Sequence, residues 1–382
     1  MNNRIFLLIL IIFITGAYIL FAADTVGYIE YIEGDVEITR DGEVYESFDL
    51  GEKDDIENFD LIRTSDSGEI IIVIDSELCP ETTITVEPNT TFNIEINKLK
   101  TKNETTLNMI TGSLALKVAE LTKGQDLNVA TEGAVMGVRG TSFGVGASPG
   151  GEILVTCDTG EVECIDESGK KLRAIPGQVV EQHPGELFRQ VPVKISDLKK
   201  FKREWNTERI EAFKPNALRA IRQYGAQYMR LINIFKKQYQ DLMKKDKVIK
   251  KWMDQKNKGE MGSKMELMKE KKELIGTLFR IRRTLFIFER VYFRLLELQN
   301  YYKQGYGKGE LKAGLSVKSF FQEFNKTSKE LQKRVAKVRF IIKLYAHRNE
   351  GQFPTDAADE DDGDFFGDDD DDDDFFDDDD DF

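Results

Sequence analysis

The spacing of hydrophobic residues divides the chain into two parts near residue 193. From Thr25 to Val193, apolar residues either alternate with polar ones, as in 91–96, or form short β-branched runs, as in 69–74. Gly, Pro, Asn and Asp separate the runs, at Asp41-Gly42 and Pro88-Asn89 among other places. A period of two is typical of half-buried strands, and about twelve strands at spacings of roughly 8–12 residues indicate a sandwich or a rolled β-domain.

After residue 193 the hydrophobic period changes to about 3.5 residues. The apolar seams are Ile221, Tyr228, Phe235 and Leu242; Leu274, Leu278, Ile281, Leu285, Phe288, Tyr292 and Leu295; and Val317, Phe321, Phe324, Leu331, Val335, Val338, Ile342 and Tyr345. Such spacing places the side chains on one face of a helix. We expect helices over roughly 216–256, 262–303 and 315–347, preceded by a shorter helix over 196–213. An antiparallel bundle is favoured, with an open coiled coil completed by another chain as the alternative.

The N-terminus has the pattern of an export signal. Asn2, Asn3 and Arg4 precede an apolar run over 5–21, which Ala22-Ala23 closes. A charged start, an apolar core and small residues are typical of a secretory signal peptide, although the run also approaches the length of a short membrane-spanning helix. We expect residues 1–23 to be a signal peptide or an N-terminal membrane anchor. The rest of the chain should be periplasmic or otherwise exported, or anchored at the inner membrane.

The charges divide the chain into acidic, basic and acidic segments. Residues 1–193 hold 14 Lys and Arg against 33 Asp and Glu, a net charge of −19, whereas residues 194–348 hold 40 against 16, a net charge of +24. Residues 356–382 hold 18 acids and no Lys or Arg. The net charge of −14 over 382 residues therefore conceals a strongly alternating molecule. We expect a β-domain over 24–193, a basic helical bundle over 195–348 and a tail over 349–382.

The C-terminal tail is of low complexity. It ends in the letters DDGDFFGDDDDDDDFFDDDDDF, in which Phe365-Phe366 and Phe375-Phe376 interrupt the aspartates. A block of like charges cannot pack into a core, so we expect the tail to be disordered. Three roles stay open: a solubilising segment, a segment that docks on a basic surface, and weak capture of Ca²⁺ by the carboxylates.

One short stretch of the β-part is the most informative motif. Residues 131–145 read TEGAVMGVRGTSFGV, in which a strand turns sharply at Val138-Arg139-Gly140-Thr141. Upstream, residues 60–64 read DLIRT, and downstream follow Gly160-Glu161-Val162 and Pro176-Gly177-Gln178. In this order, the pieces resemble the signature of the FecR domain, an exported β-rich module.

The resemblance covers about residues 24–182 and implies an exported module that binds or senses. In FecR proteins of iron-transport regulation, a cytoplasmic segment acts on a sigma factor, a membrane helix follows, and the FecR domain senses a transporter outside. This sequence departs from that plan because only residues 1–4 precede the apolar run. We therefore do not expect sigma-factor control or iron sensing. The family also includes exported proteins in which the domain accompanies other binding modules, and this use fits better.

The corner of the motif supplies candidate binding residues. Gly140 can provide a turn with positive φ before Thr141, with Arg139 then a solvated charge at a strand edge. Alternatively, the Arg139 guanidinium contacts an anionic ligand or partner, because its paired N–H groups suit a carboxylate or a phosphate. The other candidate binding residues are Phe365, Phe366, Phe375 and Phe376 of the tail.

The chain has three cysteines, Cys79, Cys157 and Cys164. Cys157 and Cys164 flank an expected hairpin turn over 158–160. A disulfide between them is one interpretation. The two cysteines lie diagonally, near the limit for bridging, if Thr159-Gly160 form the loop, and directly opposite each other if Gly160-Glu161 form it. Two small apolar strand residues are the other reading.

No motif for catalysis appears in the sequence. The two histidines, His183 and His347, fall in different parts, and the Cys and His spacings do not match a zinc site. A Gly-rich phosphate loop and a nucleophile elbow are also missing. We therefore expect no enzyme and no cofactor; a glycosidase built on carboxylates alone is the remaining catalytic reading.

These observations favour a non-catalytic binding or scaffold module of the cell envelope. The alternative is a sensory component that relays an envelope signal through a separate membrane protein. The basic bundle would bind any polyanion, but export argues against nucleic acid. The expected partners are an envelope protein, an acidic envelope polymer, or the chain's own acidic tail on the bundle. Membrane contact is expected only through an uncleaved N-terminus or anionic lipids.

Overall fold

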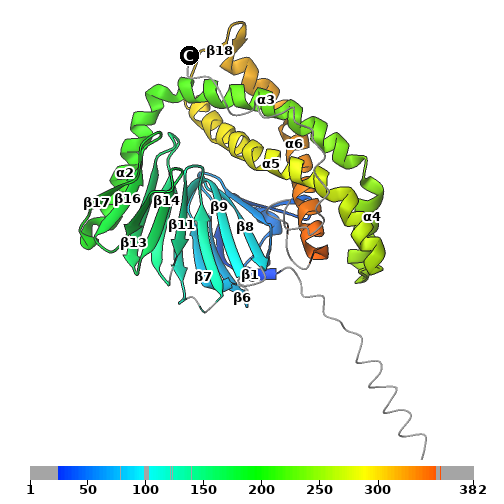
Figure 1. Ribbon diagram of the computed structural model, residues 1–382. Coiled ribbons are helices and arrows are strands. Elements are labelled where there is room, and N and C mark those ends of the chain that lie inside the picture. The colour runs from blue at the N-terminus through cyan, green and yellow to red at the C-terminus, as the bar shows by residue number, and fades with distance from the viewer. Residues whose placement is uncertain are drawn as a thin grey trace, which may run out of the picture.

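The computed structural model describes residues 25–349 and Phe353, apart from 78, 99–102, 121, 123 and 139. Strands lie between residues 25 and 192, and helices follow between 198 and 348 (Figure 1). The expected order of a β module followed by a helical region is therefore confirmed. The expected signal peptide and the acidic segment lie outside the described residues. Within the described part of the chain, no helix is both long and apolar enough to cross a membrane.

The β module is built from strands β1 to β17. Their bounds are β1 Thr25–Glu33, β2 Val36–Arg40, β3 Glu43–Glu46, β4 Asp55–Glu57, β5 Leu61–Thr64, β6 Glu69–Ser76, β7 Cys79–Val86, β8 Thr91–Lys98, β9 Asn103–Val118, β10 Gln125–Ala130, β11 Ala134–Val138, β12 Ser142–Ala147, β13 Ile153–Thr159, β14 Val162–Asp166, β15 Lys171–Ala174, β16 Gln178–Gln182 and β17 Arg189–Pro192. All pairings are antiparallel except that of β9 with β10. One layer contains β1, β4, β6, β7, β12, β13, β16 and β17, and the other contains β2, β3, β5, β8, β10, β11, β14 and β15.

Strand β9 joins the two layers. Its first part pairs with β8 and β10, whereas its last part pairs with β7 and β12 in the other layer. The strand crosses between them at Gly112, which has φ of 89°. A Cβ atom there would lie 2.4 Å from the Thr90 Cα atom, so this position requires glycine.

The core of the β module lies between the two layers. Alternate residues of each strand point inward: Ile70, Ile72 and Ile74 of β6 are at most 1% exposed, and Phe92, Ile94 and Ile96 of β8 are too. The inward positions are the apolar positions of the period-two pattern. Burial of these branched side chains supplies the main stabilising contribution, at roughly 1.5–3 kcal/mol for each fully buried side chain.

The helical region begins directly after the last strand. Its elements are η2 Ile195–Asp197, α2 Leu198–Phe213, η3 Lys214–Asn216, α3 Ala217–Met243, α4 Asp246–Lys258, α5 Lys264–Lys303, β18 Glu310–Lys312, β19 Leu315–Ser316 and α6 Val317–Arg348. The Ser263 hydroxyl accepts a hydrogen bond from the Glu266 amide where α5 begins, and Ser316 does the same for Ser319 at the start of α6. Gly259 ends α4 in the left-handed conformation.

The apolar seams of the helices are buried against one another. The Phe288 ring stacks on Phe235 with ring centroids 4.9 Å apart, and Tyr228 contacts Phe324 at 5.2 Å. Phe235 and Phe288 are 0% exposed. The seams therefore form a core within the chain. This arrangement agrees with the predicted helical bundle and differs from the open coiled coil in which another chain would cover the seams.

The helical core extends onto the β module. Helix α5 lies between α3 and the strands, and α6 runs beside them (Figure 1). Leu61 of β5 is 4% exposed and belongs to the same core as the helices, and Phe59 and Ile110 pack against that core. The two parts therefore share apolar contacts in addition to the peptide connection.

Two details of the helical region differ from the expectation. The helix expected over 216–256 is divided, because Lys245 has φ −94° and ψ 12°, outside the helical region. Asp246 then places an acidic side chain in the first turn of α4, where it interacts favourably with the helix dipole. The connection between the helices expected over 262–303 and 315–347 contains strand β18, which forms a hairpin with β19.

Substitution of Phe288 by Asp tests the helical core. An unpaired carboxylate at this fully buried position should lower the free energy of unfolding by several kcal/mol, on the order of 3–5. Thermal unfolding followed by circular dichroism measures this change. Met268→Asp on the same helix is the control, because Met268 is 60% exposed, and it should change stability by less than about 0.5 kcal/mol. Equal stability of Phe288→Asp and the wild type would contradict the assigned core.

Candidate binding groove between the β module and the helices

An open groove lies where helices α5 and α6 meet strands β8 and β9, and we call it the junction groove. Its volume is about 810 Å³, within the range of ligand-binding clefts. The strands contribute Asn93, Glu95 and Asn108 to its wall. The helices contribute aromatic, aliphatic and arginine side chains. The groove therefore combines apolar surface with positive charge.

Four arginines border the junction groove, and two of them are neutralised. The Nη2 atom of Arg282 lies 2.6 Å from Oε1 of Glu95. Arg339 donates two hydrogen bonds to Glu289, at 2.5 and 2.6 Å. Arg280 and Arg283 are exposed, and neither makes an ion pair or hydrogen bond with the described residues. Two guanidinium groups are thus available to an anion.

The helical period explains this division of the arginines. Ile281 is 0% exposed because it points into the core of the helices. Arg280 and Arg283 are three residues apart and share a neighbouring face of α5, which is exposed. Arg282 projects toward the β module instead and reaches Glu95 on β8. The inward position of Ile281 thus sets the directions of the three arginines around it.

The bidentate pair of Arg339 and Glu289 is buried. Glu289 is 3% exposed, and burial raises the pKa of its carboxyl, whereas the Arg339 guanidinium lowers it. Two parallel N–H···O bonds hold the two planes in one orientation. The pair ties α6 to α5 at the wall of the groove.

Aromatic side chains supply the apolar surface of the groove. Phe286 is 41% exposed, and the Arg290 guanidinium lies 4.1 Å from the centre of its ring. Phe59 has φ of 70°, an uncommon conformation for a residue with a Cβ atom, and its amide donates a hydrogen bond to the Ile94 carbonyl at 2.9 Å. Backbone strain and exposed aromatic rings are both common at ligand-binding surfaces.

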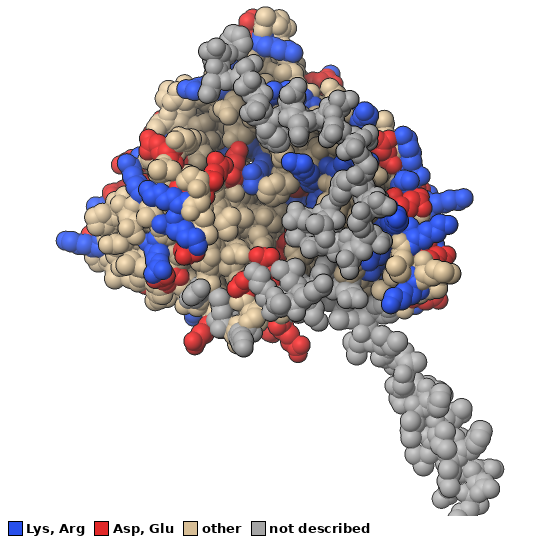
Figure 2. Space-filling model, viewed as in Figure 1, with Lys and Arg blue, Asp and Glu red and all other residues tan. Residues whose placement is uncertain are grey.

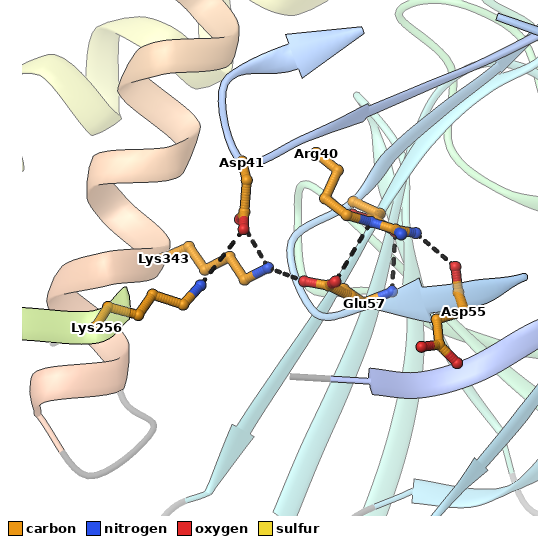
Figure 3. A network of polar contacts seen from close by, with 7 residues as sticks. Arg40, Asp41, Asp55, Glu57, Lys256 and Lys343 are labelled. Atoms are coloured by element: carbon orange, nitrogen blue, oxygen red, sulfur yellow. Dashed lines mark hydrogen bonds and ion pairs between the residues drawn. The ribbon is translucent and has the colours of Figure 1, made fainter. Parts of the chain in front are cut away.

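A polar network beside the groove joins the helices to the β module, and we call it the junction clamp (Figure 3). It consists of Arg40, Asp41, Glu57 and Asp60 from the strands and their turns, with Lys256 and Lys343 from the helices. The Lys343 ammonium donates to Asp41 at 2.9 Å and also to Glu57. Lys256 reaches the other oxygen of Asp41 at 3.4 Å. Lys343 is only 3% exposed, so the two carboxylates replace the water that its charge loses.

Asp60 is the most deeply buried carboxylate of the junction clamp. The Arg40 Nε atom lies 3.0 Å from Oδ1 of Asp60, and the Glu57 amide donates to Oδ2 at 2.9 Å. Burial raises the pKa of Asp60 to about 6, although the Arg40 guanidinium opposes the change. Arg40 also donates to the Asp55 carbonyl at 2.6 Å.

Other cations of the helices reach the β module in the same way. Arg294 is 3% exposed and donates to the Ser148 carbonyl at 3.2 Å. The Arg290 guanidinium donates to the Thr131 carbonyl at 3.3 Å, and burial lowers its pKa. Lys202 of α2 lies 2.5 Å from Glu87. Basic helices and an acidic β module therefore meet through specific side chains along their whole contact.

The corner that the sequence singled out lies away from the junction groove. Gly140 has φ of 55°, as a turn there requires. The Thr141 carbonyl accepts a hydrogen bond from the Val118 amide at 2.8 Å, at the end of β9, whereas the groove is bordered by Asn108 earlier in that strand. Arg139 and the tail residues Phe365, Phe366, Phe375 and Phe376 lie outside the described residues. A binding role for the corner stays a prediction.

The three cysteines are buried free thiols. Cys157 pairs with Phe143 in one layer, and Cys164 pairs with Met136 in the other. The hairpin expected between β13 and β14 is therefore wrong: the chain crosses between layers at Gly160, which has φ of 78°. Burial raises the pKa of Cys157 to about 11 and that of Cys164 to about 12. In this structure, Cys157 and Cys164 are therefore small apolar strand residues, as the second interpretation of the sequence expected.

Neither histidine is part of the groove. The His183 Nε2 atom lies 3.0 Å from Nη2 of Arg189 at the end of the β module, and His347 lies in the last turn of α6. Among the described residues, no group of three His, Cys, Asp or Glu side chains could hold a metal ion.

Residues 60–163 match the family model described as FecR protein. The match begins at Asp60 of the junction clamp and includes β9 and the corner at Gly140. The expected resemblance is thereby confirmed for this part of the chain.

Two solved structures are similar to part of the chain. Both are crystal structures of a candidate anti-sigma factor from Parabacteroides distasonis ATCC 8503, at 1.65 and 2.50 Å resolution. The first is 17% identical with a TM-score of 0.31 and covers 36% of this chain and 62% of its own. The second is 16% identical with a TM-score of 0.24 and covers 37% and 58%. Each match thus spans less than two thirds of the solved chain. No curated protein matches the chain.

The sequence predicted the basic region but not the junction groove. The run Phe279–Arg283, which reads FRIRR, was a signal, because three arginines surround one seam residue. Their separation into one paired and two free arginines depends on Glu95, which pairs with Arg282. Glu95 is distant in sequence, so no local pattern could reveal its pairing with Arg282.

The raised pKa of Asp60 predicts a pH dependence of stability. A carboxyl that is harder to ionise when folded contributes stability below its unfolded pKa, and this contribution is lost as the pH rises from about 4 to about 6. Linkage bounds the contribution at roughly 3 kcal/mol. Asp60→Asn removes the titration. We therefore expect the stability of the wild type, relative to Asp60→Asn, to fall between pH 4 and 6 in urea denaturation. A constant difference between the two proteins over this range would contradict the assignment.

Proposed function

We propose that this protein is a non-catalytic binding module of the cell envelope that captures an acidic polypeptide segment in the junction groove. One observation carries this proposal: Arg280 and Arg283, neither of which makes an ion pair or hydrogen bond with the described residues, border the same groove as the exposed ring of Phe286. A ligand that satisfies the groove carries carboxylates and apolar or aromatic side chains together.

The chemistry of the groove favours a polypeptide over a uniform acidic polymer. The two guanidinium groups can each form paired hydrogen bonds to a carboxylate. A polymer with charge alone would leave Phe286, Phe59 and Ile287 in water, whereas a peptide with aromatic side chains would cover them. An envelope protein with an acidic, aromatic segment is therefore the proposed partner. The chain's own acidic tail is a further candidate.

The location outside the cytoplasm is part of the proposal. The match to the FecR family and the signal-like residues 1–23 support a periplasmic protein, with cleavage near Asp24. The surface supports contact with anionic partners, since Lys and Arg side chains gather over α3 and α4 on the face shown in Figure 2. The anionic lipid surface of a membrane is the alternative ligand for these exposed cations.

A second function is favoured by the FecR match. In that case the protein is a sensory component, and the occupied groove changes its contact with a separate membrane protein that carries the signal inward. Both functions need the same groove. They differ in the consequence, because only the sensory function predicts that charge reversal in the groove alters transcription of a regulated gene.

Charge reversal in the groove tests the proposed binding. A labelled peptide with the sequence Asp-Asp-Phe-Phe-Asp-Asp is titrated with the chain that ends at Phe353, which retains every described residue. Arg280→Glu with Arg283→Glu should weaken binding at least about tenfold in fluorescence anisotropy, since two attractive contacts become repulsive. Binding should also weaken between about 0.1 M and 1 M salt, where the Debye length falls from about 10 to about 3 Å.

Lys236→Glu with Lys237→Glu on α3 provides the matched control, because both lysines are exposed and neither borders the groove. This variant has the same net charge as the groove variant and should bind the peptide nearly as well as the wild type. Equal loss in both variants would show nonspecific attraction and would refute the site. Tight binding of phosphatidylglycerol vesicles, with no binding of the peptide, would assign the surface to lipid.

A further inference from the structure

The described chain ends at the edge of the junction groove. Phe353 is 2% exposed, and its ring lies 5.5 Å from that of Phe279 and 5.5 Å from that of Tyr345. The guanidinium of Arg282 lies 4.4 Å from the centre of the Phe353 ring. Phe279 and Arg282 also line the groove. Residues 354–382 therefore start directly beside the site to which an acidic segment is proposed to bind.

The contacts of Phe353 show how this surface holds a phenyl ring. One face of the ring receives an arginine, and other aromatic rings pack around its edges. Arg290 stacks on Phe286 at 4.1 Å in the same manner. Arginine over phenylalanine contributes roughly 0.5–2 kcal/mol, depending on exposure to water. The groove is thus built for rings that come with negative charges, which Arg280 and Arg283 can meet.

The segment that follows Phe353 has this chemistry twice. Phe365-Phe366 and Phe375-Phe376 each have aspartates on both sides, and residues 356–382 contain 18 acids and no Lys or Arg. Phe365 follows Phe353 by twelve positions. This length of chain can span up to roughly 40 Å, so either Phe of the first pair can return to the groove. A short tether also gives an effective concentration on the order of millimolar.

We propose that the acidic tail occupies the junction groove of its own chain and regulates access to it. One Phe pair enters beside Phe286 and Phe59, while flanking aspartates contact Arg280 and Arg283. Glu95 and Glu289 do not repel the tail, since Arg282 and Arg339 already neutralise them. An external acidic segment must then displace the tail. This inference rests on the proposed function, because it assigns an internal competitor to the same site.

Chemical modification of arginine in the full chain tests the proposal. Phenylglyoxal reacts with accessible guanidinium groups, and mass spectrometry gives the rate at each residue. At about 0.1 M salt, Arg280 and Arg283 should react several-fold more slowly in the wild type than in the chain with Phe365→Ser, Phe366→Ser, Phe375→Ser and Phe376→Ser. High salt should reduce this difference. Arg230 on α3 is exposed and outside the groove, so it should react equally in both proteins.

The outcomes distinguish the proposal that the tail occupies the groove from the proposal that the groove binds an external segment. Equal rates at Arg280 and Arg283 in the two chains would overturn the tail as occupant, even if the labelled peptide binds to the groove. Protection of both arginines without any binding of the peptide would leave the tail as the occupant and refute capture of an external segment. Protection that increases with protein concentration would assign the groove to the tail of a second copy and overturn the intramolecular form.

Discussion

This structure depends on the contacts that buried cations of the helices make with acidic and carbonyl groups of the β module. Lys343 and Arg294 are each only 3% exposed, and removal of a charge from water costs several kcal/mol unless partners replace the water. Asp41 and Glu57 of the β module supply those partners for Lys343, whereas Glu297 of the same helix and the Ser148 carbonyl of the β module supply them for Arg294. The pairs contribute little net stability, but a wrong placement of the helices would leave the Lys343 charge buried without its partners. They therefore specify how the two parts dock.

The same constraint produces the junction groove. A net charge of +24 over residues 194–348 exceeds what the contact with the β module neutralises. Arg282 forms an ion pair with Glu95, and Arg339 forms one with Glu289. These two pairs fix the walls of the groove. Arg280 and Arg283 remain on the exposed face of α5. The charge that attracts a ligand is thus the part of the helical charge that folding does not use.

Much of the fold could be predicted from the sequence, because it depends on local periods. The β-branched run in 69–74 became strand β6, the alternation in 91–96 became strand β8, and the seams through Phe235 and Phe288 became the helical core. The docking of the helices on the β module could not be predicted, because it depends on pairs such as Lys343 and Asp41, which are far apart in the sequence. The crossing at Gly160 was also missed, because a turn signal does not show whether the next strand pairs or changes layer.

The central claim is that specific charge pairs determine how the helices dock on the β module. A protease site inserted after Lys194 separates the two parts covalently, and gel filtration with titration of the fragments measures their association. At about 0.1 M salt, the cleaved halves should remain together, and Lys343→Glu should raise their dissociation constant at least about tenfold. Lys318→Glu, an exposed position on the same helix, should leave it unchanged. Halves that separate as soon as the chain is cut, or that bind equally well with Lys343→Glu, would contradict the account.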